Sequence, residues 1–208
     1  MKENSKDIVK SKKKFIKSEK KKMGNLKKAK KIKQPKIPME KGKLNIFKIN
    51  GEFKVVPLLI NILIPVLGGI IIGYLNSNTL DTYEMLKKPF FTPPNIVFQV
   101  VWIILYMLMG ISAYRIYMRN KQGADDKGGY FYYLVQLSIN FLWSFIFFTF
   151  RLYGISFIVL IILFILILIT FIKFIKIDRI AGFLLIPYLI WVSFAGVLNY
   201  FIWALNEM

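Results

Sequence analysis

The chain has 208 residues, of which 56% are hydrophobic, and a formal net charge of +19 at pH 7. It contains no Cys and no His, which excludes disulfides, cysteine zinc sites, thiolate nucleophiles, the Ser-His-Asp triad and haem ligation through His. Of the 30 Lys and Arg residues, 20 fall within residues 1–54, so a basic tail precedes a hydrophobic body.

Residues 1–52 are expected to form a disordered, Lys-rich cytoplasmic tail, because they contain too little apolar surface to fold alone. An alternative is a polybasic segment held on anionic lipid, a partner that attracts clustered Lys side chains. In that case residues 41–54 adhere to the membrane, and Phe47 and Phe53 help to anchor them. Nucleic-acid binding is not expected, because the tail lacks Arg and interleaved aromatic residues.

The body contains five apolar stretches long enough to cross a hydrocarbon core of roughly 30 Å, which needs about 20 apolar residues. They are residues 55–75, 95–118, 130–150, 154–175 and 181–203. Short connections make neighbouring spans run up and down. The predicted fold is therefore all-α, an integral membrane bundle of five transmembrane helices within residues 53–206. The connection at residues 87–94 contains three Pro residues and is expected to be an ordered, extended loop.

The Lys and Arg residues near the span ends predict the orientation. With the N-terminus inside, seven basic residues of the body face the cytoplasm and three face outward. The seven are Arg115, Arg119, Lys121, Lys127, Lys173, Lys176 and Arg179, and the three are Lys87, Lys88 and Arg151. The prediction is a multi-pass protein of the cytoplasmic membrane with a cytoplasmic N-terminus. No charged residue is expected well inside a span, which weakens the hypothesis of an ion-coupled transporter.

The second, third and fifth spans each place aromatic and polar side chains on one face. These are Trp102 and Tyr106, then Gln136, Asn140, Trp143 and Ser144, then Tyr188, Trp191, Ala195 and Asn199. There are two interpretations. The polar side chains on these faces form hydrogen bonds with one another between helices, or the faces line an aromatic pocket in which a few polar side chains bind a ligand. The fourth span is wholly apolar from Phe157 to Ile169 and is expected to be mostly lipid-exposed scaffold.

Gly69 and Gly73 on the first span match the small-xxx-small pattern of close helix contacts. The pattern indicates packing either against a neighbouring helix of the same bundle or against a second protomer. A homodimer is therefore an open alternative.

Four longer motifs occur in a fixed order. They are KKPFFTPP at 87–94, VWIILYMLMG at 101–110, NFLWS at 140–144 and PYLIWVSFA at 187–195. Together they resemble the first loop and the second, third and fifth helices of the TspO/MBR family, whose other names are translocator protein, tryptophan-rich sensory protein and peripheral benzodiazepine receptor. The resemblance covers about residues 53–206.

The resemblance implies a membrane receptor or sensor, often dimeric, that binds porphyrins, haem, sterols and flat synthetic ligands of the benzodiazepine or isoquinoline type. Porphyrin or haem is then a ligand, and no cofactor is required. The implied ligand-binding residues are Trp102, Tyr106, Phe90, Pro93, Gln136, Asn140, Trp143, Tyr188, Trp191, Ala195 and Asn199. In this scheme the aromatic rings stack on the ligand, the amides and Tyr188 form hydrogen bonds, and the first loop closes the pocket.

Two alternatives to a binding protein stay open. One is light- and oxygen-dependent porphyrin breakdown, with Trp102 and Trp191 as redox partners and residues 89–94 as a lid. Phe90, Phe91 and Ile96 stand where relatives often carry Trp, so fewer electron-rich rings are present. The other alternative is a carrier that moves the ligand across the membrane. The sequence offers no acid-base pair and no metal site for other chemistry.

Overall fold

The structure is a computed structural model that describes residues 12, 14–20, 45–126 and 128–208. The chain divides into two compact units, residues 1–43 and 44–208, so the predicted tail boundary at residue 52 falls inside the second unit. Residues 12 and 14–20 are helical. The predictions for residues 1–11, 13 and 21–44 of the tail lie outside the described residues.

The described part of the second unit consists of helices joined by loops, and its five long helices confirm the five predicted spans. The elements are α2 (Val55–Leu75), η1 (Ser77–Thr79), α3 (Leu80–Glu84), α4 (Asn95–Lys121), α5 (Gly129–Ser144), the π-helix η2 (Phe145–Thr149), α6 (Tyr153–Ile177), α7 (Arg179–Phe183) and α8 (Ile186–Asn206). The chain is thus an all-α, multi-pass membrane protein. The helical turns η1 and α3 were not predicted from the sequence.

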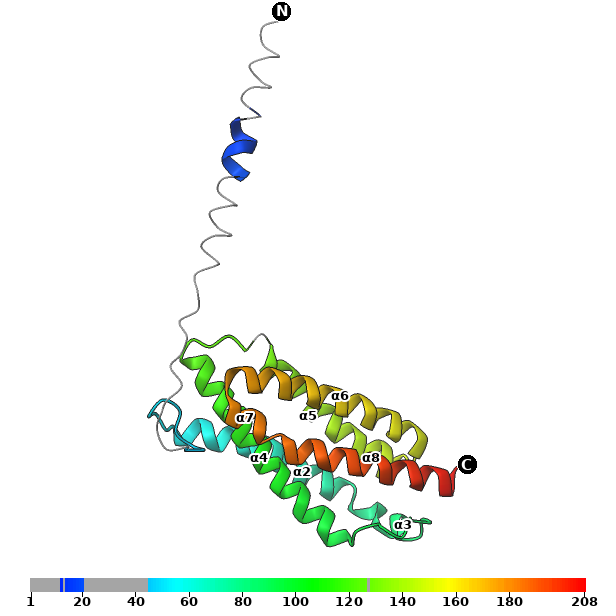
Figure 1. Ribbon diagram of the computed structural model, residues 1–208. Helices are drawn as coiled ribbons and strands as arrows, with labels where there is room; N and C mark the ends of the chain where they lie inside the picture. Colours follow the sequence, from blue (N-terminus) through cyan, green and yellow to red (C-terminus); the bar gives the residue numbers. More distant parts are fainter. Residues whose placement is uncertain (1–11, 13, 21–44, 127) are drawn as a thin grey trace, which may run out of the picture. The chain divides into compact units, whose positions relative to one another are not determined.

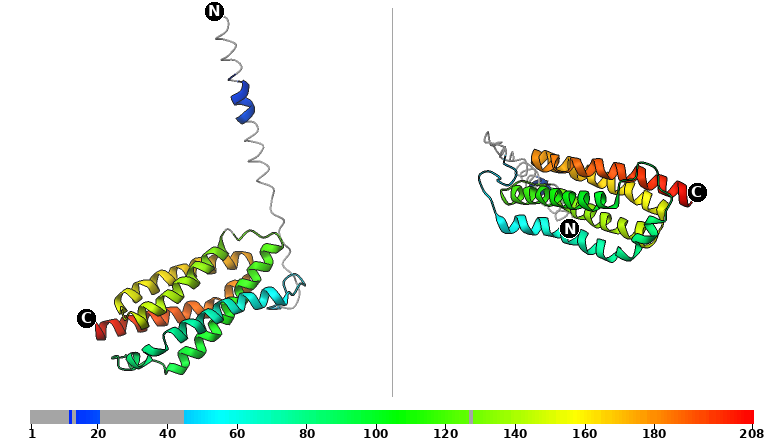
Figure 2. Two further views of the ribbon diagram at one scale, coloured as in Figure 1. Left: turned by 180° about the vertical axis from the view of Figure 1, so that it is seen from behind. Right: turned by 90° about the horizontal axis from the view of Figure 1, so that it is seen from below.

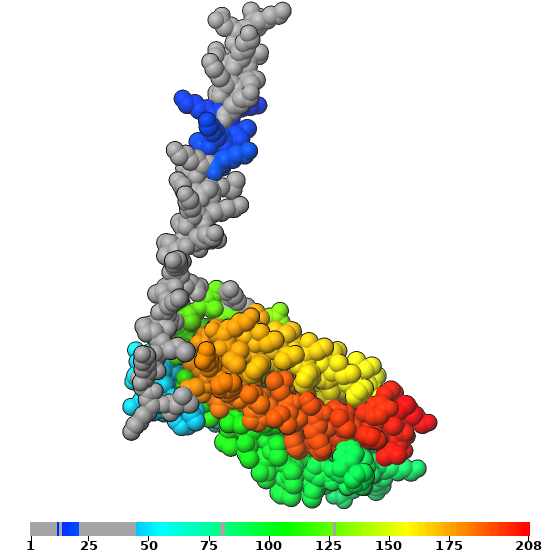
Figure 3. Space-filling model, in the orientation of Figure 1, coloured from blue at the N-terminus to red at the C-terminus, as the bar shows by residue number. Residues whose placement is uncertain are grey.

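The long helices run side by side, and α2 begins at the end of the bundle opposite to the end of α8 (Figures 1 and 2). We call residues 45–54 the strap and the end of the bundle that carries them the strap end. The opposite end carries the α2–α4 loop, residues 76–94, and is called the loop end. On the face seen in Figure 3, α7 and α8 (orange to red) lie between α6 (yellow) and α4 (green).

Helices α2 and α4 lie in close contact at Gly110. A Cβ atom added there would lie 2.5 Å from Cα of Ile62 and 2.7 Å from the carbonyl oxygen of Asn61. Because these are backbone atoms that cannot move aside, only glycine permits this contact. Gly73, further along α2 toward the loop end, has no neighbour within 4 Å of an added Cβ. The two helices are therefore in tight contact at Gly110 and leave open space at Gly73.

The wholly apolar helix α6 has one packed face and one exposed face. Leu160, Leu163 and Ile167 are almost completely buried, whereas Ile158 and Ile161 are about half exposed. The buried face packs on α5 and α8. The exposed face agrees with the expected lipid contact, but α6 is also a central packing partner of the bundle.

The last predicted span is interrupted between α7 and α8. Asp178 caps α7 by accepting a hydrogen bond from the N–H of Ala181 at 2.9 Å. The carbonyl of Ala181 in turn accepts a hydrogen bond from the Ser112 hydroxyl of α4 at 2.7 Å. Pro187 occupies the first turn of α8, where its missing N–H costs no helical hydrogen bond. The break therefore depends partly on a tertiary contact with α4.

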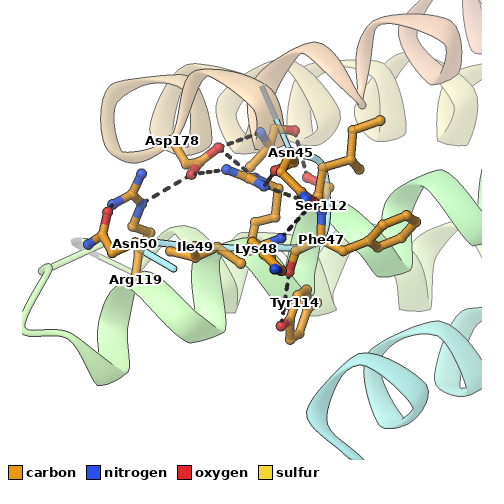
Figure 4. Close-up of polar contacts among 12 residues, drawn as sticks. Asn45, Phe47, Lys48, Ile49, Asn50, Ser112, Tyr114, Arg119 and Asp178 are labelled. Atoms are coloured by element: carbon orange, nitrogen blue, oxygen red, sulfur yellow. Dashed lines mark hydrogen bonds and ion pairs between the residues drawn. The ribbon is translucent and has the colours of Figure 1, made fainter. Parts of the chain in front are cut away.

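A buried ion pair holds the strap end together (Figure 4). The side chain of Arg115 on α4 is only 3% exposed, and its Nε and Nη2 atoms each donate to a carboxylate oxygen of Asp178 at 2.8 Å. Its Nη1 donates to the carbonyls of Asn45 and Ile46 at 3.0 and 2.6 Å. Burial alone would raise the pKa of Asp178, but the hydrogen bonds from Arg115 and from the N–H of Ala181 outweigh it and hold this pKa below its usual value.

The rest of the strap also packs onto α4. The Tyr114 hydroxyl donates to the carbonyl of Phe47 at 3.3 Å and accepts from the N–H of Lys54 at 3.1 Å. Ile49 is 1% exposed and belongs to a small apolar cluster with Tyr114 and Met118. The strap is therefore a folded part of the body, although the sequence placed most of it in the tail.

Candidate ligand-binding site

A cavity of about 470 Å³ lies in the loop-end half of the bundle, a volume typical of small-molecule sites. Its wall comes from α2, α4, α5, η2, α8 and the α2–α4 loop. The lining residues are Val66, Gly69, Ile70, Ile72, Gly73, Asn76, Ser77, Tyr83, Asn95, Phe98, Gln99, Trp102, Ile103, Tyr106, Asn140, Trp143, Ser144, Phe147, Phe148, Ala195, Leu198, Asn199 and Ile202. None of these side chains carries a formal charge.

Tyr106 and Asn140 are the lining residues of α4 and α5 that lie nearest to the strap end. A Cβ atom on Gly69 of α2 would lie 2.2 Å from the Tyr106 ring. The absence of a side chain at Gly69 therefore lets this ring pack directly against α2. Tyr106 and Asn140 together close the cavity on the side where the helices are tightly packed.

Aromatic rings from α4, α5 and η2 form one wall of the cavity. Trp102 stacks on Tyr106 with ring centroids 5.5 Å apart and an angle of 29° between the rings. Trp102 also lies 6.4 Å from Trp143, which lies 5.5 Å from Phe147. Such a series of rings presents apolar area at a small entropic cost, since the rings hold one another in place.

A chain of buried hydrogen bonds runs from this wall into the bundle. The Tyr106 hydroxyl donates to Oδ1 of Asn140 at 2.9 Å, and Nδ2 of Asn140 donates to the Tyr188 hydroxyl at 3.0 Å. The Tyr188 hydroxyl donates to Oε1 of Gln136, also at 3.0 Å. The polar side chains of α4, α5 and α8 thus do form hydrogen bonds with one another, and two of them, Tyr106 and Asn140, also line the cavity.

A second polar cluster is centred on Asn199 of α8. Its Oδ1 accepts hydrogen bonds from Nε1 of Trp143 at 3.2 Å and from the Ser156 hydroxyl at 2.8 Å. Its Nδ2 donates to the carbonyl of Tyr153 at 2.8 Å. These bonds tie α5, α6 and α8 together beside the cavity and fix the orientation of the Trp143 ring.

The structure brings six of the eleven predicted residues to the cavity wall. They are Trp102, Tyr106, Asn140, Trp143, Ala195 and Asn199. Gln136 and Tyr188 lie one layer behind the wall, in the hydrogen-bond chain. Trp191 packs against Phe98 with ring centroids 5.5 Å apart and is itself outside the wall.

The two predicted loop residues also lie outside the wall. Phe90 is fully exposed, with its ring at 5.5 Å from that of Phe91, and Pro93 is partly buried. Three other residues of the α2–α4 loop do reach the cavity, namely Asn76, Ser77 and Tyr83, and Tyr83 is 7% exposed. Burial raises the pKa of Tyr83 to about 12, so its hydroxyl stays protonated at neutral pH.

Asn76, at the end of α2, is a second lining residue that sequence reasoning missed. Its Nδ2 donates to the Ser144 hydroxyl at 3.1 Å, and its Oδ1 accepts from the Thr149 hydroxyl. Ser144 directly precedes the π-helix η2 and Thr149 is its last residue; such segments often occur at functional sites. The only sequence signal was a lone Asn just after an apolar run, which is equally typical of an ordinary helix end.

The α2–α4 loop is held over the loop end by side-chain contacts. Asn206 of α8 forms two hydrogen bonds with the backbone of Lys87, accepting from its N–H at 3.1 Å and donating to its carbonyl at 2.9 Å. Asn95 donates to the carboxylate of Glu84 at 3.1 Å. The Pro-rich stretch is thus an ordered loop, as expected. Within the described residues, no cluster of acidic side chains could hold a metal ion.

Comparison with known proteins assigns the chain to a family. The family model described as TspO/MBR matches residues 61–204, which include most of α2 and α8 and all of the long helices between them. The chain belongs to the TspO/MBR family. This membership confirms the resemblance found in the motifs, and it accounts for the order of the five helices.

Named relatives of this TspO/MBR member come from bacteria, archaea and animals. "Protein CrtK" of Rhodobacter capsulatus is 38% identical over 124 residues, which are 60% of this chain and 78% of that protein. "Tryptophan-rich protein TspO" of Archaeoglobus fulgidus is 35% identical over 137 residues, 64% of this chain and 86% of that protein. "Translocator protein" of Bos taurus is 31% identical over 151 residues, 70% of this chain and 88% of that protein.

Proposed function

We propose that this TspO/MBR member is a receptor for a flat, hydrophobic ligand of the tetrapyrrole type, bound in the cavity at the loop end. The observation that carries the proposal is the cavity itself. It holds about 470 Å³, one wall is a series of Trp, Tyr and Phe rings, and its polar groups are uncharged. A porphyrin core is flat, aromatic and apolar over most of its area, which matches this lining.

The wall supplies two kinds of contact. Trp102 and Trp143 offer ring faces for stacking, and their orientation is fixed by Tyr106 and Asn199. Asn140 offers the polar anchor, although both ends of its amide are already engaged by Tyr106 and Tyr188. A bound ligand therefore either shares these groups or takes the place of one partner.

Titration of the purified full-length protein with protoporphyrin, followed by quenching of Trp fluorescence and by the porphyrin absorption band, tests the proposal. Replacing Trp102 with Ala should weaken binding at least about tenfold, because it removes a partly buried ring that lines the cavity. The matched control is Trp203→Ala, since Trp203 packs on Phe157 outside the cavity. Absence of saturable binding, or equal effects of the two substitutions, would reject the proposal.

Oxidative breakdown of the ligand has less support. That hypothesis used both Trp102 and Trp191 as redox partners, whereas only Trp102 lines the cavity. A carrier function would need a path to the strap end, and Gly110 and the Arg115–Asp178 ion pair lie in tightly packed regions there. Binding is the function that the geometry supports best.

The strap end is proposed to face the cytoplasm, since the basic residues of the body gather there. Phe47 and Phe53 of the strap are 43% and 45% exposed, which suits insertion at an anionic lipid surface. The cytoplasmic membrane is the proposed location. A homodimer contact would have to use another surface, because Gly69 and Gly73 of α2 line the cavity.

A further inference from the structure

The cavity wall has no charge, but two cations lie next to one of its residues at the loop end. Tyr83 lines the cavity and packs its ring on Phe147 and Phe148, at centroid distances of 6.1 and 5.6 Å. Lys88 places its Nζ atom 4.3 Å from the centroid of the same Tyr83 ring. Arg151 lines a narrow recess that shares Tyr83, Phe147 and Phe148 with the cavity. Tyr83 thus lies between the uncharged cavity and a basic edge formed by Lys88 and Arg151, which we call the rim.

Both cations keep most of their hydrogen-bonding capacity. Arg151 uses Nη2 to donate to the Thr82 hydroxyl at 3.0 Å, and within the described residues neither Arg151 nor Lys88 forms an ion pair. Among the carboxylates at this end whose side chains the structure describes, Glu84 and Glu207 have other partners. Glu84 accepts from Asn95, and Glu207 accepts from two backbone N–H groups at the start of α6.

The Tyr83 hydroxyl is a third donor at this rim. It makes no hydrogen bond to another described residue, although its ring is buried. Its raised pKa of about 12 means that it donates a proton and does not repel an anion at neutral pH. A hydroxyl, an ammonium and a guanidinium are thus grouped around Tyr83 at the edge of the cavity, and these are the kinds of donor that bind carboxylates in proteins.

We propose that Tyr83, Lys88 and Arg151 form an anion subsite that binds the carboxylate groups of the ligand while its apolar body lies in the cavity. This inference rests on the proposed function and narrows it to flat hydrophobic molecules with acidic groups on one edge. Burying a carboxylate among uncharged groups is costly, so such a ligand must place its acidic edge at this rim. The subsite therefore also fixes the direction in which the ligand enters the cavity.

The test compares two probes on the full-length protein, protoporphyrin, which carries two carboxylates, and its uncharged dimethyl ester. The double substitution Lys88→Gln with Arg151→Gln should weaken binding of protoporphyrin at least about tenfold, because charge-assisted hydrogen bonds are lost. Binding of the ester should stay unchanged. Lys87→Gln is the matched control, since Lys87 contacts Asn206 through its backbone. Lys88→Arg with wild-type Arg151 keeps the charge and should keep the affinity.

The two probes separate the failure of this inference from the failure of the proposed function. If the wild type binds both probes and the double substitution leaves protoporphyrin affinity intact, the anion subsite is rejected while the receptor function stands. Equal weakening of both probes would show that the substitutions disturb the loop, and this too rejects the subsite. If the wild type binds neither probe, the proposed function is rejected and the subsite with it.

Discussion

Replacing Asp178 with Asn removes the carboxylate that neutralises Arg115, while an Asn side chain can still cap α7. Arg115 is 3% exposed, so the substitution leaves a buried cation without a counterion. Breaking a buried ion pair in this way costs about 3–5 kcal/mol. In a domain of 150–250 residues each kcal/mol shifts Tm by about 2–4 °C, so Tm should fall by about 6–20 °C.

The measurement is a thermal melt of the full-length protein in detergent, followed by intrinsic Trp fluorescence. Glu52→Gln is the matched control, because Glu52 forms an ion pair with Lys54 whose side chains are both more than half exposed. Exposed pairs contribute about 0–1 kcal/mol, so this control should melt close to the wild type. Equal shifts for Asp178→Asn and Glu52→Gln would refute the argument that burial makes the Arg115 pair important.

Three further predictions concern the same packing. Gly110→Ala should lower the free energy of unfolding by about 1–3 kcal/mol, because the added methyl group overlaps the backbone of α2. Gly73→Ala should leave the stability and the Tm unchanged. Equal Tm values for the two variants would contradict the close contact at Gly110. Deleting residues 1–43 should leave Tm unchanged, but deleting residues 1–53 should lower stability by at least about 2 kcal/mol, since it removes the buried Ile49 side chain and the strap hydrogen bonds. The folded pKa of Asp178 is lowered, so its contribution is complete above the unfolded value of about 3.9 and is lost as the pH falls through the folded value. The Tm gap between wild type and Asp178→Asn should therefore be constant from pH 7 to 5 and shrink only below about pH 4; a gap that shrinks between pH 7 and 5 would contradict it.

The number and the approximate ends of the spans followed from the sequence because a bilayer imposes a minimum apolar length. The interruption between α7 and α8 could not be predicted in this way. It depends on Asp178 and on the contact of Ser112 with Ala181, which come from distant parts of the chain. The folding of the strap likewise depends on Arg115, a residue more than 60 positions later.

Helical periodicity placed the right side chains on inward faces but did not separate the cavity wall from the layer behind it. Gln136 and Asn140 lie one turn apart on the same face of α5, yet only Asn140 reaches the cavity. The difference arises because Gln136 lies closer to the strap end. Tyr83 and Asn76 were missed because loop residues and helix ends carry no periodic signal.

The two halves of the bundle differ in what holds them together, and this difference bears on function. At the strap end, the Arg115–Asp178 pair and the close contact at Gly110 join the strap, α2, α4 and α7 into a tightly packed unit. At the loop end, the α2–α4 loop is held by hydrogen bonds that lie mostly at the surface, such as those of Asn206 with Lys87. Exposed hydrogen bonds open more easily than buried ion pairs. Any movement that admits a ligand should therefore occur in this loop, while the packed half keeps Tyr106 and Asn140 in position.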